Sequence, residues 1–524
     1  MSSRCLDAVD FHTLRHNRSG LEREMLRVTP GHRVAASPHP AALGHKLSHP
    51  RITVDFSEGL LELVSPPFES RPTMLAELAR LHNFVARGLA DGEKLWPLSM
   101  PPSATPDEIL IADFGPSLSG RMKQVYRQGL ANRYGKIMQI IAGVHYNFSF
   151  DPAFVAHMHE TMGRELAPEE CRNRLYFRLI RGFDRHAWLL PYLFGASPVA
   201  AKTSNGLAAD WLQALDDEHV GGEYATSLRM SEIGYQSPAQ AELEISHAGV
   251  ADYVRELVAA TRTPWPEYQA LGIKVDGHWR QLNGNILQIE NEYYSAIRPK
   301  QSVQLGERPA CALHTRGVEY IELRMLDVDP FEPLGIGRST AEFLEVFLLW
   351  CLSTGSEVGD WTREDKANQQ ASIRRGREPG LQLRRGGQLV PLVDWAAEVL
   401  AACDELALRL DAVHGGSQYA AAVAAQTAKL QDPRQLPSQR VLDEASAAGG
   451  YGQWAARLSD RHSQDLARAD LPGAEQSAFE AQAARSFQEA EQLARQQTGS
   501  FDDYVAAYYE SLCEESSAAL GLAR

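Results

Sequence analysis

The sequence has few cysteines, and they lie far apart. Its 524 residues contain six, with no Cys-x-x-Cys pair: Cys5, Cys171, Cys311, Cys351, Cys403 and Cys513. A disulfide framework or a zinc site needs closely spaced or regularly spaced cysteines. We therefore expect reduced, mostly buried thiols and neither of those features.

Long hydrophobic runs are also missing. The most apolar windows are Trp188–Ala201, which two prolines interrupt, and Phe343–Leu352, which contains Glu345. A membrane-spanning helix needs about 20 consecutive apolar residues. The N-terminus has no basic region followed by an apolar run, so it carries no visible signal peptide. These observations predict a soluble, cytoplasmic protein without a membrane partner.

Positive charge is in deficit, because the formal net charge is −15. An acidic chain has no general affinity for nucleic acid or for anionic lipid, so we expect neither as a partner. Anionic substrates remain open, since a few arginines or bound cations can reverse the sign of the charge inside a pocket.

The common nucleotide and hydrolase motifs are absent. There is no G-x-x-x-x-G-K-[ST] loop, no G-x-G-x-x-G, no H-E-x-x-H and no G-x-S-x-G. If the protein uses ATP, it must hold the phosphates through metal ions and arginines instead of a glycine-rich loop.

The sequence does contain polar strands, and the clearest is Gly317–Asp327. Side chains alternate faces along a strand. Glu322 and Arg324 therefore share one face with Val318 and Tyr320, while the other face is apolar: Ile321, Leu323 and Met325. For one strand alone, a solvated face with a surface ion pair is the simpler interpretation.

Other segments repeat this pattern, which favours a shared functional face over a solvated surface. The predicted strands and their polar residues are Leu21–Val28 with Glu22 and Glu24, Ile52–Val64 with Asp55 and Glu62, Gly143–Phe150 with His145 and Asn147, and Gln281–Tyr294 with Glu290 and Glu292. Neighbouring strands lie about 5 Å apart, so pairing would bring these carboxylates close together. Like charges on one face repel unless cations neutralise them. Carboxylates with one imidazole suit Mg²⁺ or Mn²⁺.

Helical patterns dominate the later part of the chain. Apolar residues at helical spacing predict helices over residues 74–89, over Leu392–Val413 and over Ala474–Gln497. We predict an α+β body over residues 1–335 and a mainly helical part over residues 336–524 that packs on it.

Several whole segments resemble the proteobacterial-type glutamate–cysteine ligases. They occur in family order between about residues 15 and 335 and are Gly20–Val28, Trp96–Pro101, Gly143–Ser149, Pro191–Pro198, Ala225–Arg229, Leu287–Glu292, Ile297–Lys300 and Glu319–Arg324. The resemblance implies a glutamine-synthetase-like antiparallel sheet that curves into a funnel. It also implies the first step of glutathione synthesis, in which ATP phosphorylates the γ-carboxylate of L-glutamate and the amine of L-cysteine displaces the phosphate.

The resemblance assigns roles to individual residues. It implies magnesium ligands at Glu22, Glu24, Asp55, Glu62, His145 and Glu322. Arg229 and Arg324 would hold a substrate carboxylate or the transferring phosphoryl group, and with Glu322 they form the expected catalytic set. The cysteine side of the pocket would include Tyr126, Gln139, Tyr235 and Tyr294, with Arg127 nearby. Feedback inhibition by glutathione is left open.

Two alternatives from other classes remain at this point. A same-fold enzyme could join glutamate to a different amine or phosphorylate a nitrogen. A non-catalytic protein could carry the acidic strands as a solvated metal-binding surface, in which case Glu322→Gln would leave ATP turnover untouched.

Overall fold

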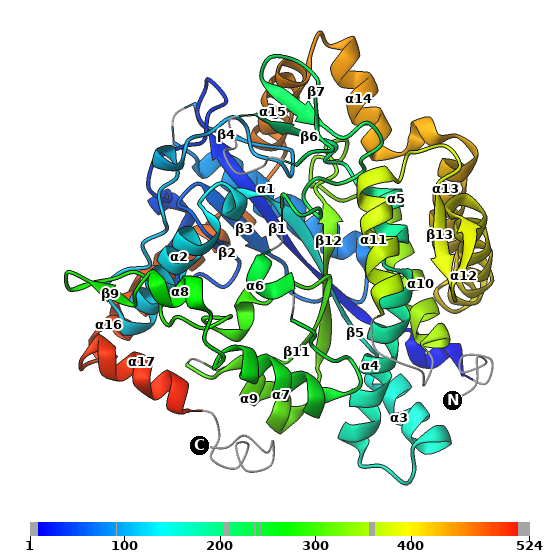
Figure 1. The fold of residues 1–524 in the computed structure, drawn as a ribbon, viewed down its shortest axis with the longest axis horizontal. Helices are drawn as coiled ribbons and strands as arrows, with labels where there is room; N and C mark the ends of the chain where they lie inside the picture. Colours follow the sequence, from blue (N-terminus) through cyan, green and yellow to red (C-terminus); the bar gives the residue numbers. More distant parts are fainter. Residues whose placement is uncertain are drawn as a thin grey trace.

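An antiparallel sheet of seven strands lies at the centre of the described chain (Figure 1). The computed structural model describes residues 9–90, 92–202, 209–234, 237–241, 243–304, 306–355 and 362–511. The strand order is β11-β12-β5-β1-β3-β2, with β4 also paired to β1. The strands are β1 (Arg18–Val28), β2 (Ile52–Val54), β3 (Leu60–Val64), β4 (Lys94–Leu95), β5 (Gly143–Ser149), β11 (Ile297–Lys300) and β12 (Tyr320–Asp327).

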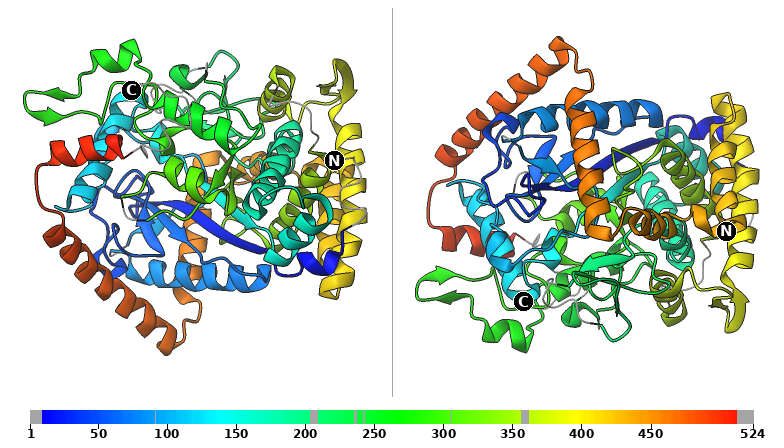
Figure 2. Two further views of the ribbon diagram at one scale, coloured as in Figure 1. Left: turned by 90° about the horizontal axis from the view of Figure 1, so that it is seen from below. Right: turned by 90° about the horizontal axis from the view of Figure 1, so that it is seen from above.

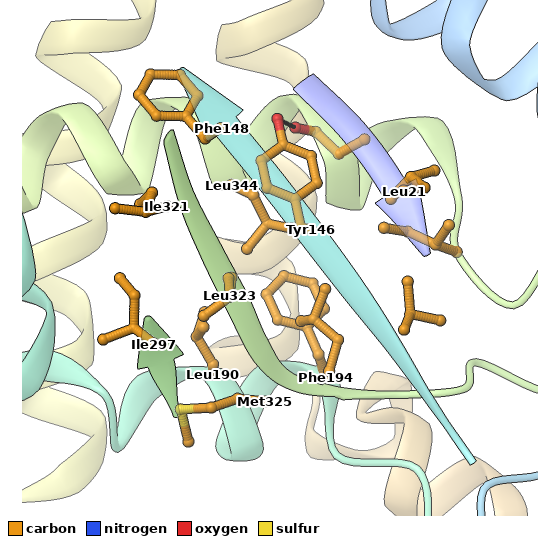
Figure 3. Close-up of a cluster of buried hydrophobic side chains, with 14 of the residues drawn as sticks. Leu21, Tyr146, Phe148, Leu190, Phe194, Ile297, Ile321, Leu323, Met325 and Leu344 are labelled. Carbon is orange, nitrogen blue, oxygen red and sulfur yellow. Dashed lines mark hydrogen bonds between the residues drawn. The ribbon is translucent and has the colours of Figure 1, made fainter. Parts of the chain in front are cut away.

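One face of this sheet is apolar and buried, as the alternation predicts. Ile321 and Leu323 of β12 lie beside Tyr146 and Phe148 of β5 (Figure 3). These side chains pack toward helices that cover the face, including Leu190 of α5 and Leu344 of α10. Because this face is fully occupied by the core, the alternate residues of the same strands must point to the opposite face.

The segment Ile52–Val64 differs from its prediction as one bent strand. It forms two paired strands, β2 and β3, joined by a turn over residues 55–59. The Ser57 carbonyl accepts a hydrogen bond from the Leu60 amide at 3.1 Å, and the Ser57 hydroxyl accepts from the same amide at 3.1 Å. The turn leaves Asp55 at the end of β2 and Glu62 within β3.

The strand predicted over Gln281–Tyr294 is wrong. The segment is irregular, with one 3-10 turn at Glu290–Glu292. Its own side chains satisfy its backbone: Gln288 Oε1 accepts from the Leu282 amide at 3.0 Å, and Glu292 Oε2 accepts from the Gln288 amide at 2.7 Å. Amide-rich segments can replace the ladder of a neighbouring strand in this way.

Helices surround the sheet, and short hairpins lie outside it. The helices before residue 335 are α1 (Arg71–Gly88), α2 (Leu118–Tyr134), α3 (Pro152–Met162), α4 (Pro168–His186), α5 (Leu189–Phe194), α6 (Pro238–Ala241), α7 (Val250–Ala260), α8 (Pro266–Ala270) and α9 (Pro309–Arg316). The smaller sheets contain β6 (Val199–Ala201), β7 (Gln213–Ala214), β8 (His219–Gly221), β9 (Lys274–Val275), β10 (His278–Trp279), β13 (Gln382–Arg385) and β14 (Gln388–Pro391).

The chain after residue 335 is mainly helical in its described part. It contains α10 (Arg338–Thr354), α11 (Arg363–Arg375), α12 (Leu392–His414), α13 (Gln418–Gln431), α14 (Pro437–Ala447), α15 (Tyr451–Arg468), α16 (Gly473–Gln496) and α17 (Phe501–Glu510). The helices predicted over Leu392–Val413 and Ala474–Gln497 are confirmed as α12 and α16. One hydrophobic core runs through both parts of the chain, from Val9 to Phe479. The division at residue 335 stays a prediction.

Two C-terminal regions lie at opposite ends of the molecule. Helices α12 and α13 lie at one end, and α17 lies at the other (Figures 1 and 2). Tyr509 of α17 donates a hydrogen bond to the Gln288 carbonyl at 2.7 Å and accepts one from Asn283 Nδ2 at 2.7 Å. The last described helix therefore braces the irregular segment 281–294. None of the helices in the described ranges combines the length and hydropathy that a bilayer span requires.

Candidate active site

The polar face of the sheet brings together carboxylates from three separated strands. In the strand register, Glu24 of β1 lies opposite Glu62 of β3, and Glu22 lies opposite His145 of β5. Glu322 of β12 lies opposite Asn147 of β5. We call the set Glu22, Glu24, Glu62, His145 and Glu322 the acidic wall.

Three members of the acidic wall form its tightest group. One donor atom each of Glu22, Glu62 and His145 lie within 4.8 Å of one another. His145 Nδ1 lies 3.1 Å from Glu22 Oε2, and Asn147 Nδ2 donates to Glu22 Oε1 at 2.9 Å. Asn147 lies on the predicted polar face of its strand, and no role was predicted for it.

The other acidic residues lie around this group. His145 connects to both remaining wall carboxylates: its Nε2 lies 3.6 Å from Glu24 Oε1, and its Nδ1 lies 3.7 Å from Glu322 Oε1. Asp55 lies outside the tight group, although its charge acts on Glu24 and Glu62. Five of the six predicted metal residues thus form one linked set, with Asp55 at its edge.

Crowding raises the pKa of the least compensated carboxyls. Burial, followed by the charges of Glu22, Asp55 and Glu24, holds the pKa of Glu62 well above its usual value. Burial also raises the pKa of Glu24, against the opposing effect of His145. This face is therefore stable only when bound protons or cations reduce its negative charge.

Cations gather at the β12 end of the acidic wall. Arg324 Nη1 lies 3.0 Å from Glu322 Oε1, and Lys300 Nζ lies 2.9 Å from Glu322 Oε2. Burial raises the pKa of Glu322, but the charges of Arg324, Lys300, His145 and Arg298 outweigh it and hold that pKa well below the usual value. This end of the wall is charge-balanced, whereas Glu62 is not.

Arg229 lies against the sheet through close packing at a glycine. It is buried, and its Nη2 donates to the Arg324 carbonyl at 3.0 Å. A Cβ at Gly143 would overlap the Arg229 guanidinium, while the Gly143 amide donates to Glu24 Oε2 at 2.6 Å. Gly143 is therefore needed for Arg229 to reach the wall.

Four of the five residues predicted on the cysteine side can be located. Gln139 Nε2 donates to the Tyr294 hydroxyl at 3.0 Å. Tyr126 and Arg127 follow each other on α2; Arg127 donates to the Asp55 carbonyl and lies 4.4 Å from the Phe114 ring centroid. Tyr235 lies outside the described residues.

A cavity of about 370 Å³ opens beside these residues. Arg229, Arg324 and Tyr294 line it, together with Lys366 and Arg374 from α11. Sequence reasoning missed the α11 residues, because the family segments end before residue 335 and single lysines on a helix carry no signal of their own.

Glu290 and Glu292 do not belong to the acidic wall, contrary to the prediction from their strand-like segment. Glu290 pairs with Arg308 at 2.6 Å, and Glu292 pairs with Arg133 at 2.9 Å and accepts from the Tyr134 hydroxyl at 2.6 Å. Each of these buried carboxylates has its own arginine.

The acidic wall fits a small, hard divalent cation. Its donors are carboxylate oxygens and one imidazole, which suit Mg²⁺ or Mn²⁺. His145 Nε2 is buried without a hydrogen-bond partner among the described residues. A bound cation would give this buried nitrogen a partner and would neutralise the carboxylates around it.

The antiparallel sheet, its crowded carboxylates and the arginine-lined cavity define the class of the protein as an α+β enzyme. Residues 5–373 match the family model for glutamate–cysteine ligase. The chain is 46% identical over 497 residues to glutamate–cysteine ligase of Pseudomonas paraeruginosa, covering 94% of each chain. It is 46% identical over 506 residues to the enzyme of Azotobacter vinelandii, covering 95% of each. The chain belongs to the glutamate–cysteine ligase family.

The fold agrees with this family. The structure matches that of glutamate–cysteine ligase from Francisella tularensis in complex with AMP, with a TM-score of 0.89 and 43% identity. The match covers 95% of this chain and 98% of that one. The predicted family and the predicted α+β fold with an antiparallel sheet are confirmed.

Proposed function

We propose that this enzyme joins the γ-carboxylate of L-glutamate to the amine of L-cysteine with ATP, as the first step of glutathione synthesis. The observation that carries the proposal is the acidic wall beside a cavity lined by Arg229 and Arg324, in a chain of this family. A γ-carboxylate oxygen attacks the γ-phosphorus of ATP, and the bond to ADP breaks. The amine then attacks the acyl carbon, phosphate leaves, and one proton is released.

The acidic wall would hold the metal that such a reaction needs. Glu22, Glu62 and His145 are the innermost candidate ligands for Mg²⁺ or Mn²⁺, with Glu24, Asp55 and Glu322 as further candidates. A bound divalent cation would neutralise phosphate charge and so reduce the repulsion between ATP and a carboxylate nucleophile.

The arginines would bind the negatively charged substrate oxygens that the metal does not contact. Arg324 is held toward the cavity by Glu322, at 3.0 Å. Its guanidinium can bind phosphoryl oxygens in two places at once, which a lysine cannot. Arg229 is fixed by its bond to the Arg324 carbonyl and would hold a substrate carboxylate. Positioning and charge stabilisation, more than proton transfer, would account for the catalysis.

The cysteine would lie on the side of Tyr126, Gln139 and Tyr294, with Arg127 behind them and Tyr235 as a further predicted contact. Burial raises the pKa of Tyr126 and of Tyr294, so both hydroxyls stay neutral and can donate hydrogen bonds. A small pocket distinguishes side chains of similar size by only about 1–3 kcal/mol. We therefore expect 2-aminobutyrate to be accepted in place of cysteine.

The reaction also suggests a location and a regulator. It consumes ATP and a reduced thiol, both of which the cytoplasm supplies, so we place the enzyme there. Glutathione contains the γ-glutamylcysteine unit of the product, and we expect it to compete for the same cavity as a feedback inhibitor.

The deciding experiment measures ADP release with L-glutamate and Mg²⁺, with and without L-cysteine. We expect release to depend on both amino acids, and the product to have the mass of γ-glutamylcysteine with a γ linkage by NMR. A panel of other amines tests the alternative acceptors. Faster turnover with another amine than with cysteine would contradict the proposed acceptor, and ADP release independent of glutamate would contradict the proposed reaction.

A further inference from the structure

Helix α11 contributes one continuous face to the cavity. Lys366, Gln369, Gln370 and Arg374 all line it, at helical spacings of three, four and eight residues from Lys366. Residues at these spacings lie on the same side of a helix. The mainly helical C-terminal part therefore supplies a wall of the same cavity that Arg229 and Arg324 border.

Hydrogen bonds and packing fix helix α11 against the segments next to Arg229 and Arg324. The Ile373 carbonyl accepts from the Thr226 amide at 2.9 Å, close to Arg229 in the chain. Gln369 Nε2 lies 3.6 Å from the sulfur of Met325, the residue after Arg324. Ser372 Oγ donates to the Trp188 carbonyl at 2.6 Å. Since α11 is fixed on several sides, its cavity-facing side chains are preorganised.

The cations of the cavity differ in what they already bind. Arg374 lies within 2.5 Å of Glu232 and 5.6 Å from the Trp211 ring centroid. Arg324 pairs with Glu322. Lys366 is half-buried, and within the described ranges its ammonium group makes neither an ion pair nor a hydrogen bond. An anionic ligand can therefore pair with Lys366 without displacing an existing partner of its ammonium group.

Gln370 indicates that the ligand also carries an N–H donor. Its Oε1 is buried, and it has no hydrogen-bond partner among the described residues. An amide oxygen accepts an N–H, and Gln370 lies one helical turn from Lys366 on the same face of α11. An amino acid offers a carboxylate and N–H donors on the same carbon. The triphosphate chain of ATP offers an anion but no N–H, because the amino group of the nucleotide lies on the adenine, at the other end of the molecule.

On this basis we infer that Lys366 binds the α-carboxylate of an amino-acid substrate in the cavity, and that Gln370 Oε1 accepts an N–H from the same molecule. The inference rests on the proposed ligase function and extends it to a residue outside the segments that carry the family resemblance. The ligand is glutamate or cysteine, because both carry this α-amino-acid group.

The test compares Lys366→Met with Lys366→Arg and with Arg363→Met, and measures the KM for glutamate, cysteine and ATP separately. Arg363 lies on the same helix, exposed and outside the cavity, so it controls for the loss of one positive charge. We expect Lys366→Met to raise the KM for one amino acid by about ten- to a hundredfold, the size expected for one hydrogen bond to a charged group. The rise in KM should exceed any fall in kcat. Lys366→Arg should recover most of the affinity, and Arg363→Met should stay within twofold of wild type.

The outcomes separate the two possible ligands and the two proposals. A rise in the glutamate KM identifies glutamate, a rise in the cysteine KM identifies cysteine, and either supports the inference. Unchanged KM values for both, or a rise for ATP alone, would overturn it. If Lys366→Met does not fold, as judged by its thermal transition, Lys366→Gln and equilibrium binding of each amino acid decide the question. If wild type shows no ADP release dependent on glutamate and cysteine, the proposed function fails; if wild type is active and the Lys366 variants match it, only the inference fails.

Discussion

Buried carboxylates occur in two contrasting arrangements in this protein. Behind the sheet, Glu345 of α10 pairs with Arg71 of α1 at 2.6 Å, with side chains 1% and 2% exposed. Tyr419 donates to the same carboxylate at 2.9 Å, and Asn17 donates to its other oxygen at 3.2 Å. Both oxygens of this buried carboxylate are hydrogen-bonded within the protein, so the pair joins helices and is not exposed to a ligand.

The acidic wall has the opposite arrangement. Its carboxylates face one another across strands, and arginine and lysine reach mainly Glu322. Crowding of like charge costs stability unless a cation is present. Burial alone therefore does not distinguish the two sets, and unbalanced charge on a shared face is what makes the acidic wall the candidate functional site.

The largest expected effect comes from removing the charge-balanced end of the wall. Glu322→Gln releases Arg324 and Lys300 and removes one candidate metal ligand. We expect kcat/KM to fall by about 10²–10³-fold or more, with little change in the unfolding midpoint. Glu319→Gln, an exposed carboxylate near the same strand, is the control. Equal activity in the Glu322 variant and the control would remove the distinction between the two arrangements.

The paired arrangement should respond in stability instead. Arg71→Met leaves Glu345 buried with an uncompensated charge. We expect a loss of about 3–5 kcal/mol in the free energy of unfolding, measured by urea titration, while the folded fraction keeps its kcat. The double variant Arg71→Met/Glu345→Leu should recover part of the loss. A fall in kcat without a stability change would mean that this pair serves the site.

Divalent cations should stabilise the acidic wall alone. At a hundred times the Kd, a ligand that binds only the folded state adds about 2.7 kcal/mol of stability. We expect Mg²⁺ or Mn²⁺ to raise the thermal midpoint of wild type, EDTA to reverse the rise, and Glu62→Gln to show a much smaller one. An equal rise in Glu62→Gln would place the metal elsewhere.

The last effect appears only on acidification and concerns a buried histidine that has no carboxylate partner among the described residues. Burial, with a further effect from the charge of Arg23, lowers the pKa of His82 on α1 to about 3. The unfolded chain takes up a proton near pH 6.5 and the folded protein does not. Stability is therefore fully present above pH 6.5 and declines as the pH falls toward 3, by about 1.4 kcal/mol per pH unit.

We expect His82→Leu to flatten this slope between pH 6 and pH 4, measured by urea titration at each pH. His12→Leu, at the exposed start of the described chain, is the control and should keep the wild-type slope. Identical slopes in all three proteins would show that His82 does not limit acid stability.

Strand alternation predicted which side chains share the polar face, because it is a local property. Glu322 and Arg324 on one face, and His145 and Asn147 on another, follow from a period of two residues. The pairing of Glu290 with Arg308 and of Glu292 with Arg133 could not be predicted this way. The sequence of a carboxylate-rich segment is the same whether arginines or other carboxylates lie next to it in the fold. Those neighbours come from distant parts of the chain.

The contribution of α11 to the cavity could not be predicted from the sequence either. Lys366 lies 42 residues after Arg324 in the sequence, and the packing of α11 against α5 and α4 brings both to one cavity. The composition of segment 281–294 predicts a strand, because it matches that of the other polar strands. Its hydrogen bonds to its own side chains, and not its composition, decide its shape.

The brace between Tyr509 and segment 281–294 has a consequence for how the enzyme matures. Tyr509 bonds to Asn283, which precedes it by 226 residues. During synthesis the earlier residues leave the ribosome first and begin to fold. The segment 281–294, which contains Tyr294 and contacts the Tyr126 carbonyl, therefore cannot gain this brace until α17 has been synthesised.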